Sequence, residues 1–156
     1  MIDTQKFHIK GEFPTITAQQ KGSRVVKVKG KLTVMHYTKP EVKKAAEKFC
    51  RQLLPFKPKD MITGPCRVQI TWVFPWRKSE KKSIIKKYQM IPKTTKPDVG
   101  NMTKLFLDCM TKVGYFTDDA IVFNEDNWKF WGDDELVGIH VKITTGPMLG
   151  AVEKKV

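Results

Sequence analysis

The 156-residue chain has few of the residues that build disulfide frameworks or zinc sites. It contains three cysteines and three histidines, and no cysteine pair has CxxC spacing. The odd number and wide separation of the cysteines argue against disulfides and zinc knuckles, and the histidines lack the HxxxH spacing of a helical zinc pair. We therefore expect Cys50, Cys66 and Cys109 to be small buried hydrophobic residues.

Long apolar runs are also missing. None approaches the ~18 residues that a transmembrane helix needs. The first ten residues, MIDTQKFHIK, lack the apolar stretch of a signal peptide. These two observations predict a soluble, intracellular protein.

Acidic residues are scarce, with 16 Asp+Glu against 29 Lys+Arg and a formal net charge of +13. Hydrophobic residues make up 40% of the chain, which is ordinary for a folded protein. The length suits a single domain over residues 1–156. A positive surplus of this size predicts a polyanionic partner, either nucleic acid or an anionic membrane surface.

Apolar and polar positions alternate in the N-terminal part of the chain. Over residues 1–37 this alternation predicts strands joined by turns at Gly22 and Gly30. Pro40 then begins a helix that we expect to reach about Leu54, because apolar residues recur at helical spacing and Pro55 follows.

The C-terminal part alternates between strand and helix patterns. Residues 67–74 predict a strand bounded by turn residues on both sides. A near-ideal apolar stripe over 102–113 predicts a helix that ends at Gly114, and a strand should follow over about 121–130. The expected fold class is α+β, with a mixed sheet of about four to five strands and two main helices.

More than half of the positive surplus lies in residues 77–96, which we call the basic arm. Eight basic residues oppose only Glu80 there, a net charge of +7. Lysine runs are often solvated loops, but Trp76, Tyr88 and the Ile84-Ile85 pair interleave these charges, which suits contact with nucleic-acid phosphates. The candidate DNA-binding residues are Arg77, Lys78, Lys81, Lys82, Lys86, Lys87, Lys93 and Lys96.

The next segment, 98–135, reverses the sign, with nine acidic and three basic residues. It forms either a solvated acidic surface or a cation site beside the basic arm. Asp118 and Asp119 precede a strand, where adjacent aspartates often only form a turn. If that strand doubles back beside the helix start, it brings Asp98 near one of them, and such a carboxylate group favours Mg²⁺.

Simpler roles exist for the polar residues of the predicted helix. Asp98, directly after Pro97, stands where a helix N-cap belongs. Lys104 and Asp108 are four residues apart and can pair on the helix surface without any function.

The segment from Lys96 to Val122 reads KPDVGNMTKLFLDCMTKVGYFTDDAIV. It resembles the signature of RusA-type Holliday junction resolvases, which runs approximately Pro-Asp-x-Asp-Asn-x-x-Lys, then a helix with a further Asp, a Gly, and Asp-Asp-x-x-Val. Weaker similarities extend over most of the chain, including a Lys-aromatic pair at 129–130 and a Tyr-Thr-x-Pro sequence at 37–40. The matching positions are Asp98, Asn101, Lys104, Asp108, Gly114, Asp118, Asp119 and Val122.

This resemblance implies a homodimeric endonuclease that makes paired nicks in four-way DNA junctions during recombination and repair. It implies Mg²⁺ as the cofactor, with Mn²⁺ able to replace it, and the cytoplasm of a bacterium or phage-infected host, without a membrane partner. Asp98, Asp118 and Asp119 would bind the metal, with Asp98 and Asp119 catalytic. Lys104, also catalytic, would stabilise the phosphate or its leaving group.

One position departs from the family pattern, because Gly100 stands where the signature has its second aspartate. Asp118, Asp108 or Glu125 could supply the missing oxygen, the change could be inactivating, or the protein could bind junctions without cutting them. A two-metal mechanism becomes difficult without this carboxylate. We expect weak or absent cleavage with DNA binding intact.

Two other classes of function remain open. A noncatalytic protein that binds junctions or other nucleic acids needs only the charge of +13. A ribosome-associated RNA binder fits the size and charge but leaves the acidic segment without a purpose.

Overall fold

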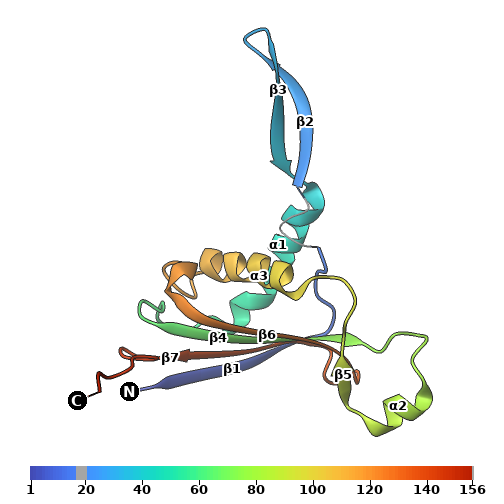
Figure 1. The fold of residues 1–156 in the computed structure, drawn as a ribbon, viewed down its shortest axis with the longest axis vertical. Coiled ribbons are helices and arrows are strands. Elements are labelled where there is room, and N and C mark those ends of the chain that lie inside the picture. The colour runs from blue at the N-terminus through green and yellow to red at the C-terminus, as the bar shows by residue number, and fades with distance from the viewer. Residues whose placement is uncertain (17–20, 156) are drawn as a thin grey trace.

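The computed structural model describes residues 1–16 and 21–155. Its centre is a five-stranded mixed sheet in the order β1-β7-β4-β6-β5, and a separate two-stranded sheet consists of β2 and β3 (Figure 1). This architecture, with two main helices, confirms the predicted α+β class. The strands are β1 Asp3–Lys10, β2 Lys21–Val28, β3 Lys31–Thr38, β4 Cys66–Pro75, β5 Met90–Pro92, β6 Val122–Gly132 and β7 Gly138–Thr145; the helices are α1 Pro40–Leu53, α2 Lys82–Lys87 and α3 Val99–Val113, with 3-10 turns η1 Leu54–Phe56 and η2 Asp119–Ile121.

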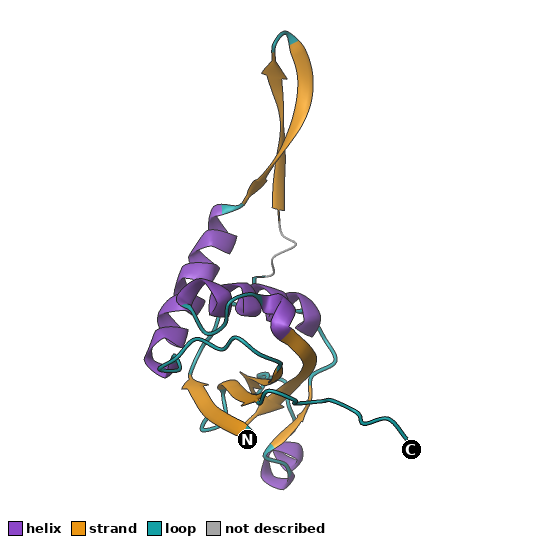
Figure 2. Cartoon of the chain, turned by 90° about the vertical axis from the view of Figure 1, so that its left-hand side faces the viewer, coloured by secondary structure: helices purple, strands orange, loops and turns teal. Residues whose placement is uncertain are grey.

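Helices α1 and α3 lie beside the main sheet (Figures 1 and 2). They bury their apolar faces in one core with it. Trp72 of β4 is fully buried there, and its ring meets Phe49 of α1 and Phe106 of α3 edge-on at centroid distances of 6.0 and 5.4 Å. The amphipathic stripes predicted both helices correctly, because each apolar face has the width that a sheet surface can cover. No helix in residues 1–16 and 21–155 has the length and apolar character needed to span a membrane.

The parallel pairing of β4 with β6 explains why α3 lies where it does. Parallel neighbours need a crossover connection, and α3 provides it. Gly114 ends the helix with φ +90°, as predicted from its sequence position. All three cysteines are free thiols, and the expectation that they are buried is confirmed for Cys66 and Cys109, whereas Cys50 is only half-buried.

Strands β2 and β3 form a hairpin that projects away from the rest of the chain (Figures 1 and 2). Its turn consists of Lys29 and Gly30, with φ of 48° and 80°, so the turn predicted at Gly30 is confirmed. The turn predicted at Gly22 is wrong. Gly22 lies inside β2 opposite Tyr37, whose ring occupies the space that a Cβ would need.

Candidate active site

Asp98 is the N-cap of α3. Its Oδ1 accepts a hydrogen bond from the backbone N of Asn101 at 3.1 Å, so the simple structural role considered for it is confirmed. The carboxylate is exposed and lies at the positive end of the helix dipole. The ammonium of Lys129 fixes the preceding loop, because its Nζ donates to the carbonyl oxygens of Thr95 at 2.5 Å and Pro97 at 2.7 Å. Asp98 is therefore held in place from both its helix and the end of β6.

Asp118 and Asp119 are adjacent carboxylates in the connection between α3 and β6. Asp118 caps η2, accepting a hydrogen bond from the N of Ala120 at 2.8 Å, and this bond, followed by one to Asp119, lowers its pKa. The pKa of Asp119 is raised, first by its hydrogen bond to Asp118, then by desolvation and the charges of Asp118 and Asp108. Two carboxylates that compete in this way for a proton form a site that a cation would stabilise.

The structure does not bring Asp98 together with this pair in one chain. Strand β6 does double back along α3. Lys129, in the C-terminal half of the strand, reaches the start of the helix, whereas Asp118 and Asp119 precede the first residue of the strand. Asp108, whose charge acts on Asp119, is ten residues from Asp98, or ~15 Å along the helix axis. Among the residues that the structure describes, no three His, Cys, Asp or Glu side chains converge on a possible metal position.

Lys104 lies on the exposed face of α3 and lines a groove between α1 and α3 with a volume of about 860 Å³. Asp108 and Lys112 of α3 line the same groove. Lys43 and Glu47 of α1 lie opposite them. This mixed charge can contact either a phosphate or a second protein surface.

Gly100 has no structural need to be glycine. A Cβ built there meets only the Oδ1 of Asp98, at 3.3 Å, and no other atom within 4 Å. A side chain therefore fits at this position after a small shift of one exposed carboxylate. An aspartate at 100 would place its carboxylate beside that of Asp98 in the first turn of α3, where negative charge is favourable.

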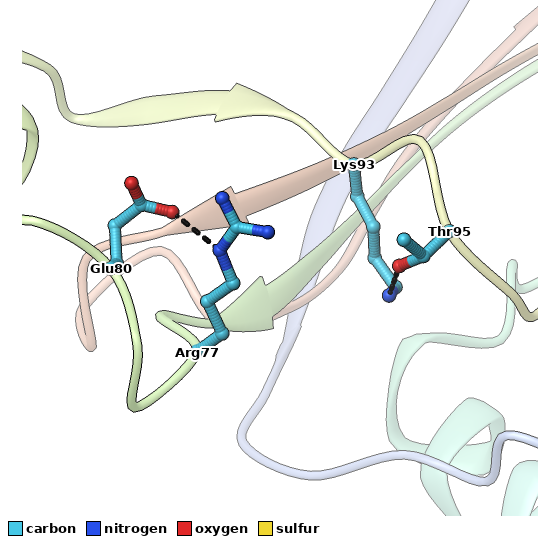
Figure 3. A network of polar contacts seen from close by, with 4 residues as sticks. All are labelled: Arg77, Glu80, Lys93 and Thr95. Atoms are coloured by element: carbon cyan, nitrogen blue, oxygen red, sulfur yellow. Dashed lines mark hydrogen bonds and ion pairs between the residues drawn. The ribbon is translucent and has the colours of Figure 1, made fainter.

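The basic arm is built from two ordered parts, α2 and β5, and β5 pairs with β6. Lys93 does not face solvent. Its Nζ donates to the Oγ1 of Thr95 at 2.6 Å (Figure 3). The same Nζ lies 3.8 Å from the centroid of the Trp131 ring. Desolvation, followed by the charges of Lys129 and Arg77, lowers its pKa. Lys93 thus supports the arm from within and is not available for the DNA contacts expected of it.

The remaining candidate residues of the basic arm are exposed. Arg77 is the only one of them with an ion pair in the described part of the chain, donating from Nε to the Oε2 of Glu80 at 2.8 Å (Figure 3). The exposed positive side chains are Arg77, Lys78, Lys81, Lys82, Lys86, Lys87 and Lys96.

A chain of hydrogen bonds that runs from the core to the surface connects α3 with the sheet, and no sequence pattern had indicated it. The Oγ1 of Thr103 accepts from the Nε1 of Trp72 at 3.2 Å and donates to the Oδ1 of Asn127 at 2.9 Å. Asn127 in turn donates to Glu125 at 2.7 Å. The only signal in the sequence was a threonine beside the apolar stripe of α3, and the chain holds this helix in register on β4 and β6.

We expect Thr103→Val to lower the free energy of unfolding by about 1–3 kcal/mol, because it removes both hydrogen bonds of the Thr103 hydroxyl and leaves the Nε1 of the fully buried Trp72 unsatisfied. Denaturant unfolding of the purified chain measures this loss. Thr111→Val is the matched control, since the Thr111 hydroxyl on the same helix donates to the carbonyl of Leu107 and has no other hydrogen bond in the described part of the chain. Equal losses in the two variants would contradict a special role for Thr103.

A family model described as "Endodeoxyribonuclease RusA" matches residues 14–144 of the chain. The match includes the α3 segment with Asp98, Gly100 and Lys104, and both Asp118 and Asp119. It also covers the projecting hairpin and the basic arm. None of the curated proteins compared matches the chain.

Proposed function

Because the chain belongs to the RusA endodeoxyribonuclease family, whose activity is junction-resolving endonuclease cleavage, we propose that it binds four-way DNA junctions and cuts them in a Mg²⁺-dependent reaction weakened by Gly100. The observation that carries this proposal is the presence of an anchored Asp98 at the start of α3 and of the adjacent, hydrogen-bonded carboxylates of Asp118 and Asp119 beyond its other end. Lys104 lies between them on the exposed helix face.

The three carboxylates that the family resemblance assigns to the metal do not converge within one chain, over the residues that the structure describes. Asp118 and Asp119 together offer two carboxylates, and Mg²⁺ in proteins is usually held by one or two carboxylates, waters and substrate phosphates. Asp98 can join them only from a second chain, because it lies at the other end of α3. We therefore propose that a homodimer completes the site.

The charge pattern of α3 supports this dimer. Lys104 and Asp108 stand symmetrically about position 106, the midpoint of the helix. Two antiparallel copies of α3 related by a two-fold axis at this midpoint would place each lysine opposite the partner's aspartate. The same arrangement sets Asp98 of each chain against the carboxylate pair of the other.

Each residue then has a separate chemical task. Mg²⁺ or Mn²⁺, when bound, offsets the negative charge that develops on the phosphate oxygens. Lys104 adds a fixed positive charge near the phosphate or the leaving oxygen. Lys129 orients the loop that carries Asp98, since its ammonium binds the two carbonyls before it.

Nicking of a four-way junction in Mg²⁺ by this chain and by a Gly100→Asp variant tests the proposal. A noncatalytic junction-binding protein is the second candidate, and the missing carboxylate at Gly100 is the observation that favours it. If the Gly100→Asp variant binds junctions and remains inactive, the second candidate is the better description.

The basic arm should contribute DNA affinity through its phosphate contacts. We expect replacement of Lys81, Lys82, Lys86 and Lys87 by alanine to reduce the slope of log affinity against log salt by about 2–4, since each phosphate contact contributes about 0.9. Junction binding at several salt concentrations measures the slope.

Four exposed lysines away from the arm provide a control with the same loss of charge: Lys6, Lys10, Lys154 and Lys155. If both quadruple variants keep the slope of the unmodified chain, the arm is only a solvated surface.

A further inference from the structure

The projecting β2–β3 hairpin has no role in the activity described so far. The structure assigns it one, and we propose that this hairpin is a DNA-reading ribbon that enters the major groove of a duplex arm of the junction. This inference rests on the proposed function, because it names the element that grips the DNA next to the branch point.

The first observation is the isolation of the hairpin. Within residues 1–16 and 21–155, strands β2 and β3 pair only with each other, and they stand clear of the main sheet and helices (Figures 1 and 2). Every residue of β3 is exposed, and large apolar side chains face water, including Leu32 at 78% and Val25 at 65% exposure. An isolated two-stranded hairpin is only marginally stable in water, so this one needs a partner.

The charge of the hairpin identifies the partner. Between positions 13 and 40 the sequence has no Asp or Glu and six basic residues. Apposed copies of such a hairpin would repel each other, whereas a polyanion complements the whole segment. The basic residues are Lys21, Arg24, Lys27, Lys29, Lys31 and Lys39.

The strand register distributes these charges over both faces. Residues directly opposite each other share a face, so Arg24 with Met35 and Val28 with Lys31 lie on one face. Lys27 with Leu32 lies on the other. A protein surface that contacts DNA from outside the groove needs cations on one face only. A ribbon inside the groove has a phosphate backbone on each side, so it needs cations on both faces.

The tip of the hairpin carries a further positive charge under backbone strain. Lys29 has φ of 48°, a conformation in which Asn, Asp or Gly is usual at this turn position. A lysine there costs about 1 kcal/mol. The strain is explained if the tip must present an ammonium group to a phosphate.

The dimensions of the hairpin match those of the major groove. Eight-residue strands extend about 25 Å, and the major groove, about 12 Å wide, admits a two-stranded ribbon. The apolar residues between the cations, such as Val25 and Val34, suit contact with thymine methyl groups and sugars. At the base of the hairpin the Tyr37 ring packs directly against Gly22 and joins the two strands there.

The test measures junction affinity of the full chain with Arg24→Gln, Lys27→Gln and Lys31→Gln combined. We expect at least a 10-fold loss at ~0.15 M salt and a slope of log affinity against log salt reduced by about 2–3. A matched variant with Lys6→Gln, Lys10→Gln and Lys154→Gln removes the same charge elsewhere and should lose less than about 3-fold by the same reasoning. Equal losses in the two variants would overturn the inference.

Methylation of guanine N7 by dimethyl sulfate locates the contact, because N7 lies in the major groove. We expect protected guanines in the duplex arms with the unmodified chain and loss of that protection with the hairpin variant. Unprotected guanines throughout the arms would overturn the groove placement.

Light scattering of the free proteins tests the alternative that the hairpin binds a second copy of the chain and not DNA. The hairpin variant should keep the oligomeric state of the unmodified chain, and a change of state would overturn the DNA assignment. If the unmodified chain does not bind the junction, the proposed function fails and the inference with it. Tight binding that is insensitive to the hairpin changes overturns the inference alone.

Discussion

Replacing Gly100 with aspartate is expected to raise the rate of junction nicking in Mg²⁺ by at least ~100-fold, because a single preorganised electrostatic group commonly contributes 10²–10³ in rate. The new carboxylate would stand beside Asp98 and restore the acid that the family signature carries at this position. Affinity for the junction should change little, since the basic arm and the hairpin are untouched. A nicking assay with a labelled four-way junction, together with a binding titration, measures both quantities.

The structure has room for an aspartate side chain at position 100. The added Cβ meets only the Oδ1 of Asp98 at 3.3 Å, so the backbone of α3 need not move. Gly100→Asn is the matched control, because it adds a side chain of the same shape without the charge. Robust nicking by the unmodified chain, equal to that of the aspartate variant, would contradict the proposed weakening.

Mixing two inactive variants should restore activity if the site is shared between chains. In the Gly100→Asp background, Asp98→Asn and Asp119→Asn each remove one essential carboxylate and should each nick at least ~100-fold more slowly. Each proposed site combines Asp98 of one chain with Asp119 of the other. In a dimer of one Asp98→Asn chain and one Asp119→Asn chain, one site therefore carries both substitutions and the other site carries neither. With free exchange of chains, about a quarter of all sites are then complete in a two-fold dimer.

A mixture of Asp98→Asn with Asp98→Ala is the control for this complementation, since no arrangement of those two chains yields an intact site. Nicking of the junction by co-refolded mixtures is the measurement. If Asp98→Asn with Asp119→Asn stays as inactive as the control, the site does not combine Asp98 of one chain with Asp119 of the other.

Local patterns predicted the elements that bear the site. The apolar stripe of α3 and Gly114 specified a helix and its end, because burial on a sheet requires that spacing and a left-handed C-terminal residue favours glycine. Asp98 was recognisable as a cap for the same local reason. The strand β7 and the short α2 and β5 were not predicted, since their patterns are brief or interrupted and depend on neighbours for support.

Distances between residues remote in sequence were not predictable. The idea that β6 doubles back was correct, but the strand is long enough that its end, not its entrance, reaches Asp98. Lys93 looked like one more exposed lysine of the basic arm. Only the position of Trp131 and Thr95 around its ammonium shows that it is buried.

The sequence by itself determined the two main helices, α1 and α3, and the central strand β4. It also determined the family, through the spacing of Asp98, Lys104, Asp118 and Asp119, and a positive charge that favours a polyanionic partner. These properties follow from local periodicity and composition, which a chain carries before it folds. The tertiary structure alone decided that β2 and β3 leave the main sheet, that Gly100 has room for a side chain and that the carboxylates separate to the two ends of α3. Those outcomes depend on how elements pack across long sequence separations, and no local pattern encodes that packing.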